Sequence, residues 1–263
     1  MTSSELEAPP LDTARRLAED GDLDGAAAIL RRLVADPEGA DRAQAAVGLA
    51  VVLEEGGDVA GARAAARAAL ATGHPEYAAQ AACHLAEGFE REGRDEQARA
   101  AWQAVLGVGT PAYVPLAHLA LARLAGDPGE AESELRAAID AGDGPVRAHA
   151  ARELAALLLD HGEPGMAADV LLEALEAAPE DEVPGLRVQL GIAHLELACA
   201  EFAETVEGGG ADPRTSALAI ELLARTLPLR GRPDDADRVW SYGLEHEDAT
   251  LAAEVRLRYQ RDS

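Results

Sequence analysis

Cysteine and histidine side chains can ligate a metal ion or act together as nucleophile and base, and Cys83 and His84 are adjacent in the sequence. If this segment is helical, neighbouring side chains point about 100° apart, so the pair cannot close on one metal ion without ligands from other segments. The second cysteine, Cys199, is distant, and the other histidines are scattered singly along the chain. We therefore predict no metal site and no cofactor, and a reducing compartment in place of a disulfide framework.

Three carboxylates at Asp234, Asp235 and Asp237 have the composition of a metal-binding loop. They come directly after Pro233, which favours the first turn of a helix. Carboxylates in a first turn stabilise the helix dipole and accept hydrogen bonds from free N–H groups, so capping is the favoured interpretation. The sequence has no phosphate-binding loop, dinucleotide motif, nucleophile elbow or His-Glu-x-x-His. We therefore predict that the protein is not an enzyme.

The overall composition predicts helices and a charged surface. Hydrophobic residues make up 48% of the chain but aromatic residues only 3%, and most of the apolar fraction is Ala and Leu, which are strong helix formers. The net charge is −25, from 48 acidic residues against 23 basic ones, and every basic residue is Arg. The electric field of such a negative protein repels the phosphates of nucleic acids. The N-terminus lacks the features of a signal peptide, and no uncharged apolar stretch is long enough to span a membrane. These features predict a cytoplasmic protein that binds neither nucleic acid nor membrane.

Breaks in the helical pattern recur at a steady interval and indicate the elements that must carry any binding site. The intervals between successive glycines are 36, 36, 33, 36 and 69 residues, for Gly21, Gly57, Gly93, Gly126, Gly162 and Gly231. The last interval is nearly double, so we predict one turn without glycine near Ala198. Alanine stands five residues after each turn position, at Ala26, Ala62, Ala98, Ala131, Ala167, Ala203 and Ala236. Glycine permits a tight turn, and a small residue lets two helices approach closely, so each unit is predicted to be a helical hairpin.

The third repeat shows the pattern most fully, with Leu85-Ala86, Gly93, Ala98, Trp102 and Pro111. It resembles the tetratricopeptide repeat family, whose unit is a helical hairpin of about 34 residues. The resemblance implies an all-α, right-handed α-solenoid of about seven antiparallel hairpins over residues 11–248, after a flexible segment 1–10 and before a C-terminal capping helix 249–263. Turns are then expected near residues 21, 57, 93, 126, 162, 198 and 231. Another helical-hairpin repeat of 35 to 36 residues is an alternative.

Two repeats depart from the pattern. The fourth repeat has a shortened first helix, so its register slips by one residue before Gly126. In the sixth repeat Gly208-Gly209-Gly210 interrupts the second helix, because glycine is a weak helix former. The triplet is expected to be a loop between repeats, or alternatively a hinge.

The resemblance further implies a non-catalytic interaction module or scaffold, in which the first helices line a concave groove for a partner peptide or helix. A sensing or regulatory subunit of a larger protein is an alternative, and an enzyme whose site is assembled across repeats is a weaker one. In the family, groove residues stand 13, 10, 6, 3 and 2 positions before the turn glycine. In this sequence they are Gln44, Val47, Val51, Glu54 and Glu55, then Gln80, Cys83, Glu87, Glu90 and Arg91, then His149, Arg152, Ala156, Leu159 and Asp160.

The predicted groove residues favour one kind of partner. Relatives that bind acidic C-terminal tails use Lys and Asn at these positions, and this chain contains neither residue type. Glu54, Glu55, Glu87 and Glu90 instead bring negative charge beside Val47 and Val51. We therefore expect a protein or peptide partner that is basic and partly apolar.

Overall fold

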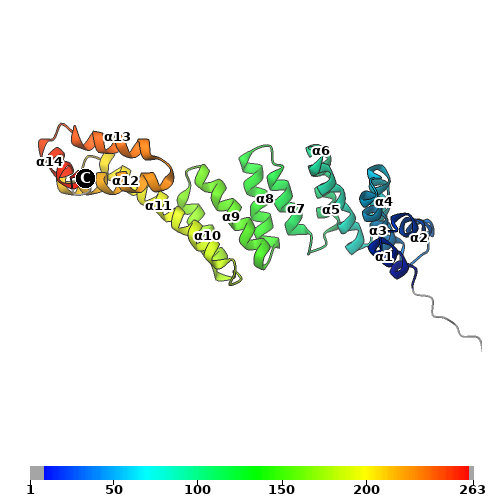
Figure 1. The fold of residues 1–263 in the computed structure, drawn as a ribbon. Helices are drawn as coiled ribbons and strands as arrows, with labels where there is room; N and C mark the ends of the chain where they lie inside the picture. The colour runs from blue at the N-terminus through cyan, green and yellow to red at the C-terminus, as the bar shows by residue number, and fades with distance from the viewer. Residues whose placement is uncertain (1–8, 261–263) are drawn as a thin grey trace, which may run out of the picture. The chain divides into compact units, whose positions relative to one another are not determined.

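The computed structural model describes residues 9–260, which form fourteen α-helices and one short 3-10 helix and contain no strand (Figure 1). The helices follow one another in packed pairs, which confirms the predicted all-α, solenoid-type fold class. Residues 1–8 of the expected flexible segment and residues 261–263 of the expected capping helix lie outside the described residues. Between residues 9 and 260, no helix has the length and apolar character needed to cross a membrane.

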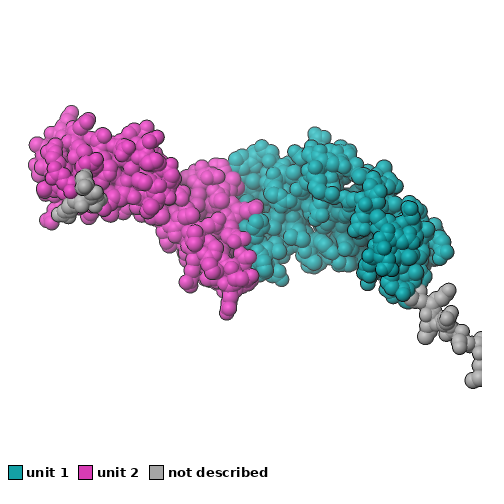
Figure 2. Space-filling model, viewed as in Figure 1, with its two compact units in different colours: residues 1–150 teal, residues 151–263 magenta. Residues whose placement is uncertain are grey.

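The chain divides into two compact units, residues 1–150 and residues 151–263, which Figure 2 colours separately. The first unit contains α1 (Pro10–Glu19), α2 (Leu23–Ala35), α3 (Arg42–Glu55), α4 (Val59–Ala71), α5 (Pro75–Arg91), α6 (Asp95–Val108), α7 (Val114–Arg123) and α8 (Pro128–Ala141). The division falls within α9 (Gly144–Asp160). The second unit continues with α10 (Pro164–Glu176), α11 (Val183–Glu207), α12 (Pro213–Thr226), the 3-10 helix η1 (Leu227–Arg230), α13 (Pro233–Leu244) and α14 (Ala249–Tyr259).

In the first unit each odd-numbered helix from α1 to α7 packs against the helix that follows it, so the pairs are hairpins. In the first three hairpins the turn is tight because its glycine adopts a left-handed conformation, with φ of 81° at Gly57 and 68° at Gly93. Gly126, in the turn between α7 and α8, does not adopt it. Asp58, the next residue after Gly57, accepts a hydrogen bond from the backbone N–H of Gly61 at 2.9 Å. That bond caps the first turn of α4, so the Gly-Asp pair both closes the turn and starts the second helix.

The alanine five residues after a turn lies where the two helices of a hairpin meet. Ala62 is 2% exposed, and Ala98 and Ala167 are completely buried. Ala98 of α6 belongs to a core cluster with Leu85 and Phe89 of α5, the first helix of its own hairpin. The small residue therefore allows the close approach of the two helices.

Replacing Ala98 by leucine is expected to lower the free energy of unfolding by about 1–3 kcal/mol, because the larger side chain would overpack a closed helix crossing. Urea denaturation of the whole chain measures the change. The matched control is Ala100→Leu on the exposed face of the same helix, which should change stability by less than about 0.5 kcal/mol. Equal midpoints for the two variants would show that the assigned register is incorrect.

The turn predicted near Ala198 is wrong. Helix α11 runs unbroken over 25 residues, from Val183 to Glu207, and contains Ala198. Residues 192–207 include neither glycine nor proline, so nothing in this segment favours the left-handed conformation of a tight turn. Helix propensity therefore prevails, and the described residues form six hairpins with α11 as one long helix in place of a seventh.

The segments on either side of the last hairpin follow the sequence more closely. Helix α11 ends where the glycine triplet begins, and Gly209 has a φ of 61°. Helix α14 follows the last hairpin, and its Leu251 and Val255 pack with Ala217 and Ile220 of α12 in one buried cluster. It thus covers the apolar face of α12, in the place where a capping helix was expected.

Candidate partner-binding surfaces

Two hollows of the first unit contain most of the residues that the turn spacing assigned to a groove. The first hollow has a volume of about 530 Å³ and is lined mainly by α1, α3 and α5. Four predicted residues line it: Gln44, Val47, Val51 and Gln80. Its surface is largely apolar, because Leu11 and Tyr77 join the two valines, and Val51 is 42% exposed. Such a surface can hold the apolar anchors of a ligand.

The second hollow has a volume of about 580 Å³ and lies against α5, α6 and α7. Five predicted residues line it: Cys83, Glu87, Glu90, Arg91 and His149. Tyr113, Leu116, Leu119 and Arg123 complete one wall. This surface combines charged side chains of both signs with the apolar side chains of Leu116 and Leu119.

One face of α5 separates the two hollows. Glu76 and Gln80 line the first hollow, and Cys83, Glu87 and Glu90 line the second. These positions are spaced by 4, 3, 4 and 3 residues, so they follow one stripe of a helix. We call this stripe the α5 face. It offers a partner a continuous surface with a hollow on either side.

Arginines of the next repeat neutralise two of the carboxylates expected to make the groove acidic. Glu54 accepts a hydrogen bond from Arg91 at 2.5 Å and lies 2.9 Å from Nε2 of His84. The hydrogen bond from Arg91 is the main reason that the pKa of Glu54 is lowered. Glu90 is bonded in the same way to Arg123, at 3.2 Å, and also accepts a hydrogen bond from Nε1 of Trp102. The expectation of gathered negative charge is therefore corrected: the groove alternates in sign, with Glu87 exposed between the arginines.

Cys83 and His84 face different surroundings. Cys83 is buried at the edge of the second hollow, whereas His84 pairs with Glu54. Burial, with a smaller contribution from Glu87, raises the pKa of the Cys83 thiol to about 12. The thiol is therefore protonated at neutral pH, which disfavours a nucleophilic role. Among the described residues, no group of three or more His, Cys, Asp or Glu side chains could hold a metal ion.

The remaining predicted residues lie elsewhere. Glu54 lines a small hollow of about 90 Å³ with Arg63, His84 and Arg91. Glu55 is exposed at the end of α3 and lines neither large hollow. Arg152 belongs to the second unit, where it forms an ion pair with Glu182 at 3.1 Å.

Sequence reasoning missed the lining residues of α1 and the fourth repeat, although the same spacing gives them. Counted back 10 and 6 residues from Gly21 it gives Leu11 and Arg15, which line the first hollow. Counted back 13, 10 and 3 residues from Gly126 it gives Tyr113, Leu116 and Arg123, which line the second hollow. The fourth repeat was omitted because its first helix is short, at 10 residues against 17 in α5, yet the positions closest to the turn glycine keep their order.

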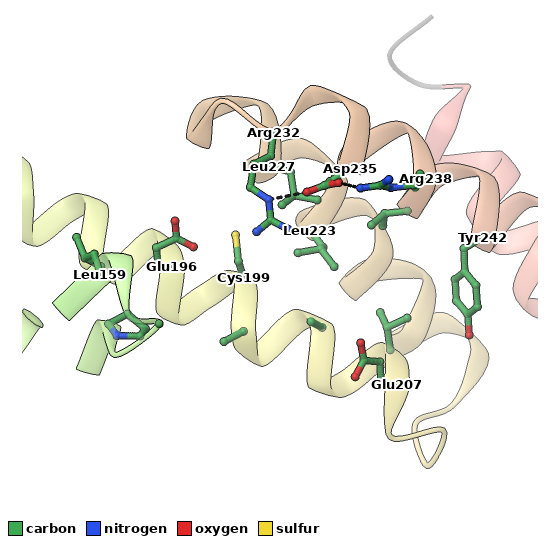
Figure 3. Close-up of a pocket in the computed structure, with 16 residues that line it drawn as sticks. Leu159, Glu196, Cys199, Glu207, Leu223, Leu227, Arg232, Asp235, Arg238 and Tyr242 are labelled. Carbon is green, nitrogen blue, oxygen red and sulfur yellow. Dashed lines mark hydrogen bonds and ion pairs between the residues drawn. The ribbon is translucent and has the colours of Figure 1, made fainter. Parts of the chain in front are cut away.

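A third surface, which we call the unit-2 hollow, lies wholly within the second unit and has a volume of about 600 Å³ (Figure 3). Helix α11 forms one side and α13 the other, and Leu223 and Leu227 contribute from α12 and η1. Of the predicted groove residues, Leu159 alone lines it. Sequence reasoning missed the rest of this hollow, because it placed a turn near Ala198 where α11 runs straight.

The acidic cluster of α13 lies at the edge of the unit-2 hollow. Asp235 binds Nε of Arg232 at 2.6 Å and also binds Arg238, as the dashed lines in Figure 3 show. No side chain caps the first turn of α13 by a hydrogen bond. The predicted place of Asp234 and Asp235 in the first turn of a helix is confirmed, and there they stabilise the helix dipole. Only the predicted hydrogen bond to a free N–H group is wrong for Asp235, whose carboxylate binds two arginines.

A family model and several solved structures match the chain. The model of the tetratricopeptide repeat matches residues 11–78 and 121–182. No curated protein matches the chain by sequence. Similar solved structures include a tetratricopeptide repeat protein from Parabacteroides merdae ATCC 43184, with 14% identity, 95% of this chain and 97% of that chain covered, and a TM-score of 0.48. Another is a thermophilic tetratricopeptide repeat protein from Thermus thermophilus, with 25% identity, 71% of this chain and 97% of that chain covered, and a TM-score of 0.37.

The residues matched by the family model and the packing of the helices indicate the same kind of repeat. Helices pack in consecutive pairs, glycine turns join them, and an alanine lies buried five residues after five of the six glycine turns. The family's fold generally serves protein interaction and not catalysis. Over residues 11–78 and 121–182 the chain is made of tetratricopeptide repeats.

Proposed function

We propose that the first unit is a non-catalytic binding module that holds a segment of a partner protein along the α5 face, between the first and second hollows. The segment places apolar side chains in the first hollow, against Val47, Val51 and Tyr77. Its polar part lies over the second hollow, where a basic residue meets the exposed carboxylate of Glu87. Buried anchors supply most of the affinity of such contacts, while charges set orientation and association rate.

The observation that carries this proposal is the convergence of residues chosen only by their distance from a turn. Of the fifteen, four line the first hollow and five line the second, and both hollows border the same face of α5. Residues at these offsets in α1 and α7 line the same hollows. The surface is therefore built by the repeat itself, one helix after another, as a groove for an extended or helical segment would be.

Replacing Val51 by arginine is expected to weaken binding of the native partner by about tenfold or more, because a charged side chain would fill the apolar hollow. A photoreactive amino acid at position 51 first captures the partner from the host, and mass spectrometry identifies the cross-linked segment. Calorimetry with a peptide of that segment then compares the unmodified chain with Val51→Arg. The matched control is Val59→Arg, since both valines are 42% exposed and Val59 lies outside the two hollows.

The role of charge is tested in the same titration with Glu87→Arg and with Glu176→Arg on α10, since both glutamates are exposed. Only Glu87→Arg should reduce affinity, and more strongly at low salt than at physiological salt. Glu90 is left unchanged because it also bonds Arg123 and Trp102. Equal binding by Val51→Arg and Val59→Arg would reject the first hollow as the anchor site.

A further inference from the structure

The unit-2 hollow exposes a helix-crossing position of the repeat pattern that no hairpin partner covers, although Ala203 packs on one side against the cluster of Leu223, Leu227 and Ala236. Ala203 stands five residues after the position of the missing turn, so it corresponds to Ala98 and Ala167 in the repeat pattern. Those two alanines are completely buried, whereas Ala203 is only half-buried and lines the unit-2 hollow. The alanine that would allow two helices to approach is present, but the chain supplies no second helix because α11 does not fold back.

The unit-2 hollow also has the dimensions and the apolar character that a helix requires. Its lining runs along α11 from Glu196 to Glu207, which at 1.5 Å per residue is about 16 Å, or three helical turns. Between these ends α11 contributes Ala200, Ala203 and Val206, and the opposite side contributes Val239. Small residues on one wall and larger apolar residues on the other make a groove that admits a helix backbone.

The two edges of the unit-2 hollow carry opposite charges. On the α13 edge the side chains of Arg232 and Arg238 are 55% and 78% exposed, and they share the single carboxylate of Asp235. On the α11 edge Glu207 is exposed near the far end, as its label in Figure 3 shows. A ligand that fits both edges must carry an acidic residue on one flank and a basic residue on the other. An amphipathic helix presents its flanks in this way, on either side of an apolar stripe.

We propose that the unit-2 hollow is a docking groove for one amphipathic helix of a partner protein. The apolar stripe of that helix packs on Ala203, Leu223 and Leu227. An acidic residue on one flank meets Arg238, and a basic residue on the other meets Glu207. The helix takes the place of the hairpin partner that α11 lacks. This site is separate from the α5 face and does not depend on the function proposed for it.

The test uses a display library of peptides of about 18 residues, long enough for several helical turns. An alanine- and leucine-rich stripe is fixed at helical spacing, and both flanks are randomised. The library is selected on the full chain and depleted on Ala203→Trp, whose indole would fill the groove. Ala253→Trp on the exposed face of α14 is the matched control. Fluorescence anisotropy then measures the affinity of selected peptides for each variant.

We expect selected peptides to carry acidic residues on one flank and basic residues on the other. They should bind Ala203→Trp about tenfold or more weakly while binding Ala253→Trp as they bind the unmodified chain. Arg238→Glu changes only an exposed edge of the hollow and should also weaken binding of the selected peptides. This variant should instead favour peptides that carry a basic residue on the flank that meets position 238. Val51→Arg should have no effect, which separates this site from the α5 face.

The proposal is overturned if selection yields no peptide whose binding depends on Ala203, or only peptides without a charged pattern on their flanks. A dimer of this chain that Ala203→Trp dissociates without any peptide would assign the hollow to a second copy. Binding of laurate, but of no peptide, at the same hollow would assign it to a small apolar molecule.

Discussion

Trp102→Ala is expected to lower the free energy of unfolding by about 3–5 kcal/mol, the cost of removing a large aromatic side chain from a packed core. Trp102 is 4% exposed and packs in a cluster with Val105 of its own helix and with Ala117 and Leu121 of α7. Its removal leaves a cavity between neighbouring hairpins. Urea denaturation measures the loss, and hydrogen exchange should locate it in α5 to α7, because contacts in a repeat array are local.

Trp102→Phe is the control that separates packing from hydrogen bonding. Phenylalanine keeps an aromatic ring in the cluster but cannot donate the Nε1 hydrogen bond to Glu90. We expect it to cost about 1–2 kcal/mol, much less than alanine. If Trp102→Ala and Trp102→Phe lose equal stability, the hydrogen bond and not the core packing gives Trp102 its importance. A loss below about 1 kcal/mol for alanine would contradict the burial itself.

Leu171→Ala is expected to have the next largest effect, about 2–5 kcal/mol, in the second unit. Leu171 lies in α10 nine residues after Gly162, as Trp102 lies nine residues after Gly93, and it is completely buried. Leu172, the next residue, is 48% exposed. The same leucine-to-alanine substitution can therefore be compared at two adjacent positions of α10, one buried and one exposed.

Leu172→Ala should change the unfolding free energy by less than about 0.5 kcal/mol. Thermal and urea unfolding of both variants, followed by circular dichroism, measures the contrast. A reversed order of stability would mean that the face of α10 assigned to the core is incorrect. Similar losses would mean that α10 contributes to stability through helix propensity and not through the position of each leucine.

Much of the fold could be predicted from the sequence, because in this fold local signals coincide with tertiary ones. Gly57 and Gly93 set the turns through their left-handed conformation, and Ala62 and Ala98 are buried where the two helices meet. Helices adjacent in sequence are adjacent in space, so turn spacing determines which helices pack together. The same spacing identified nine residues of the first and second hollows.

Charge pairing could not be predicted in this way. The sequence places Glu54 and Glu90 on the groove, but only the packed structure brings Arg91 and Arg123 of the following repeats against them. The electrostatic potential of the groove depends on these two ion pairs, whose residues are 37 and 33 positions apart in the sequence. The sequence gives the number and the positions of these charges, but it does not show which of them form ion pairs.

The course of α11 is the other feature that only the tertiary structure decided. The repeat period indicated a turn near Ala198, but residues 192–207 contain neither glycine nor proline, the residues that most favour a turn, and α11 continues through them. By itself the sequence determined the all-α class, five of the six hairpin turns with their glycines in positive φ, and the buried alanines. The unit-2 hollow could be found only from the tertiary structure. Local helix propensity kept α11 helical where the repeat period predicted a turn, and the hollow lies along that helix.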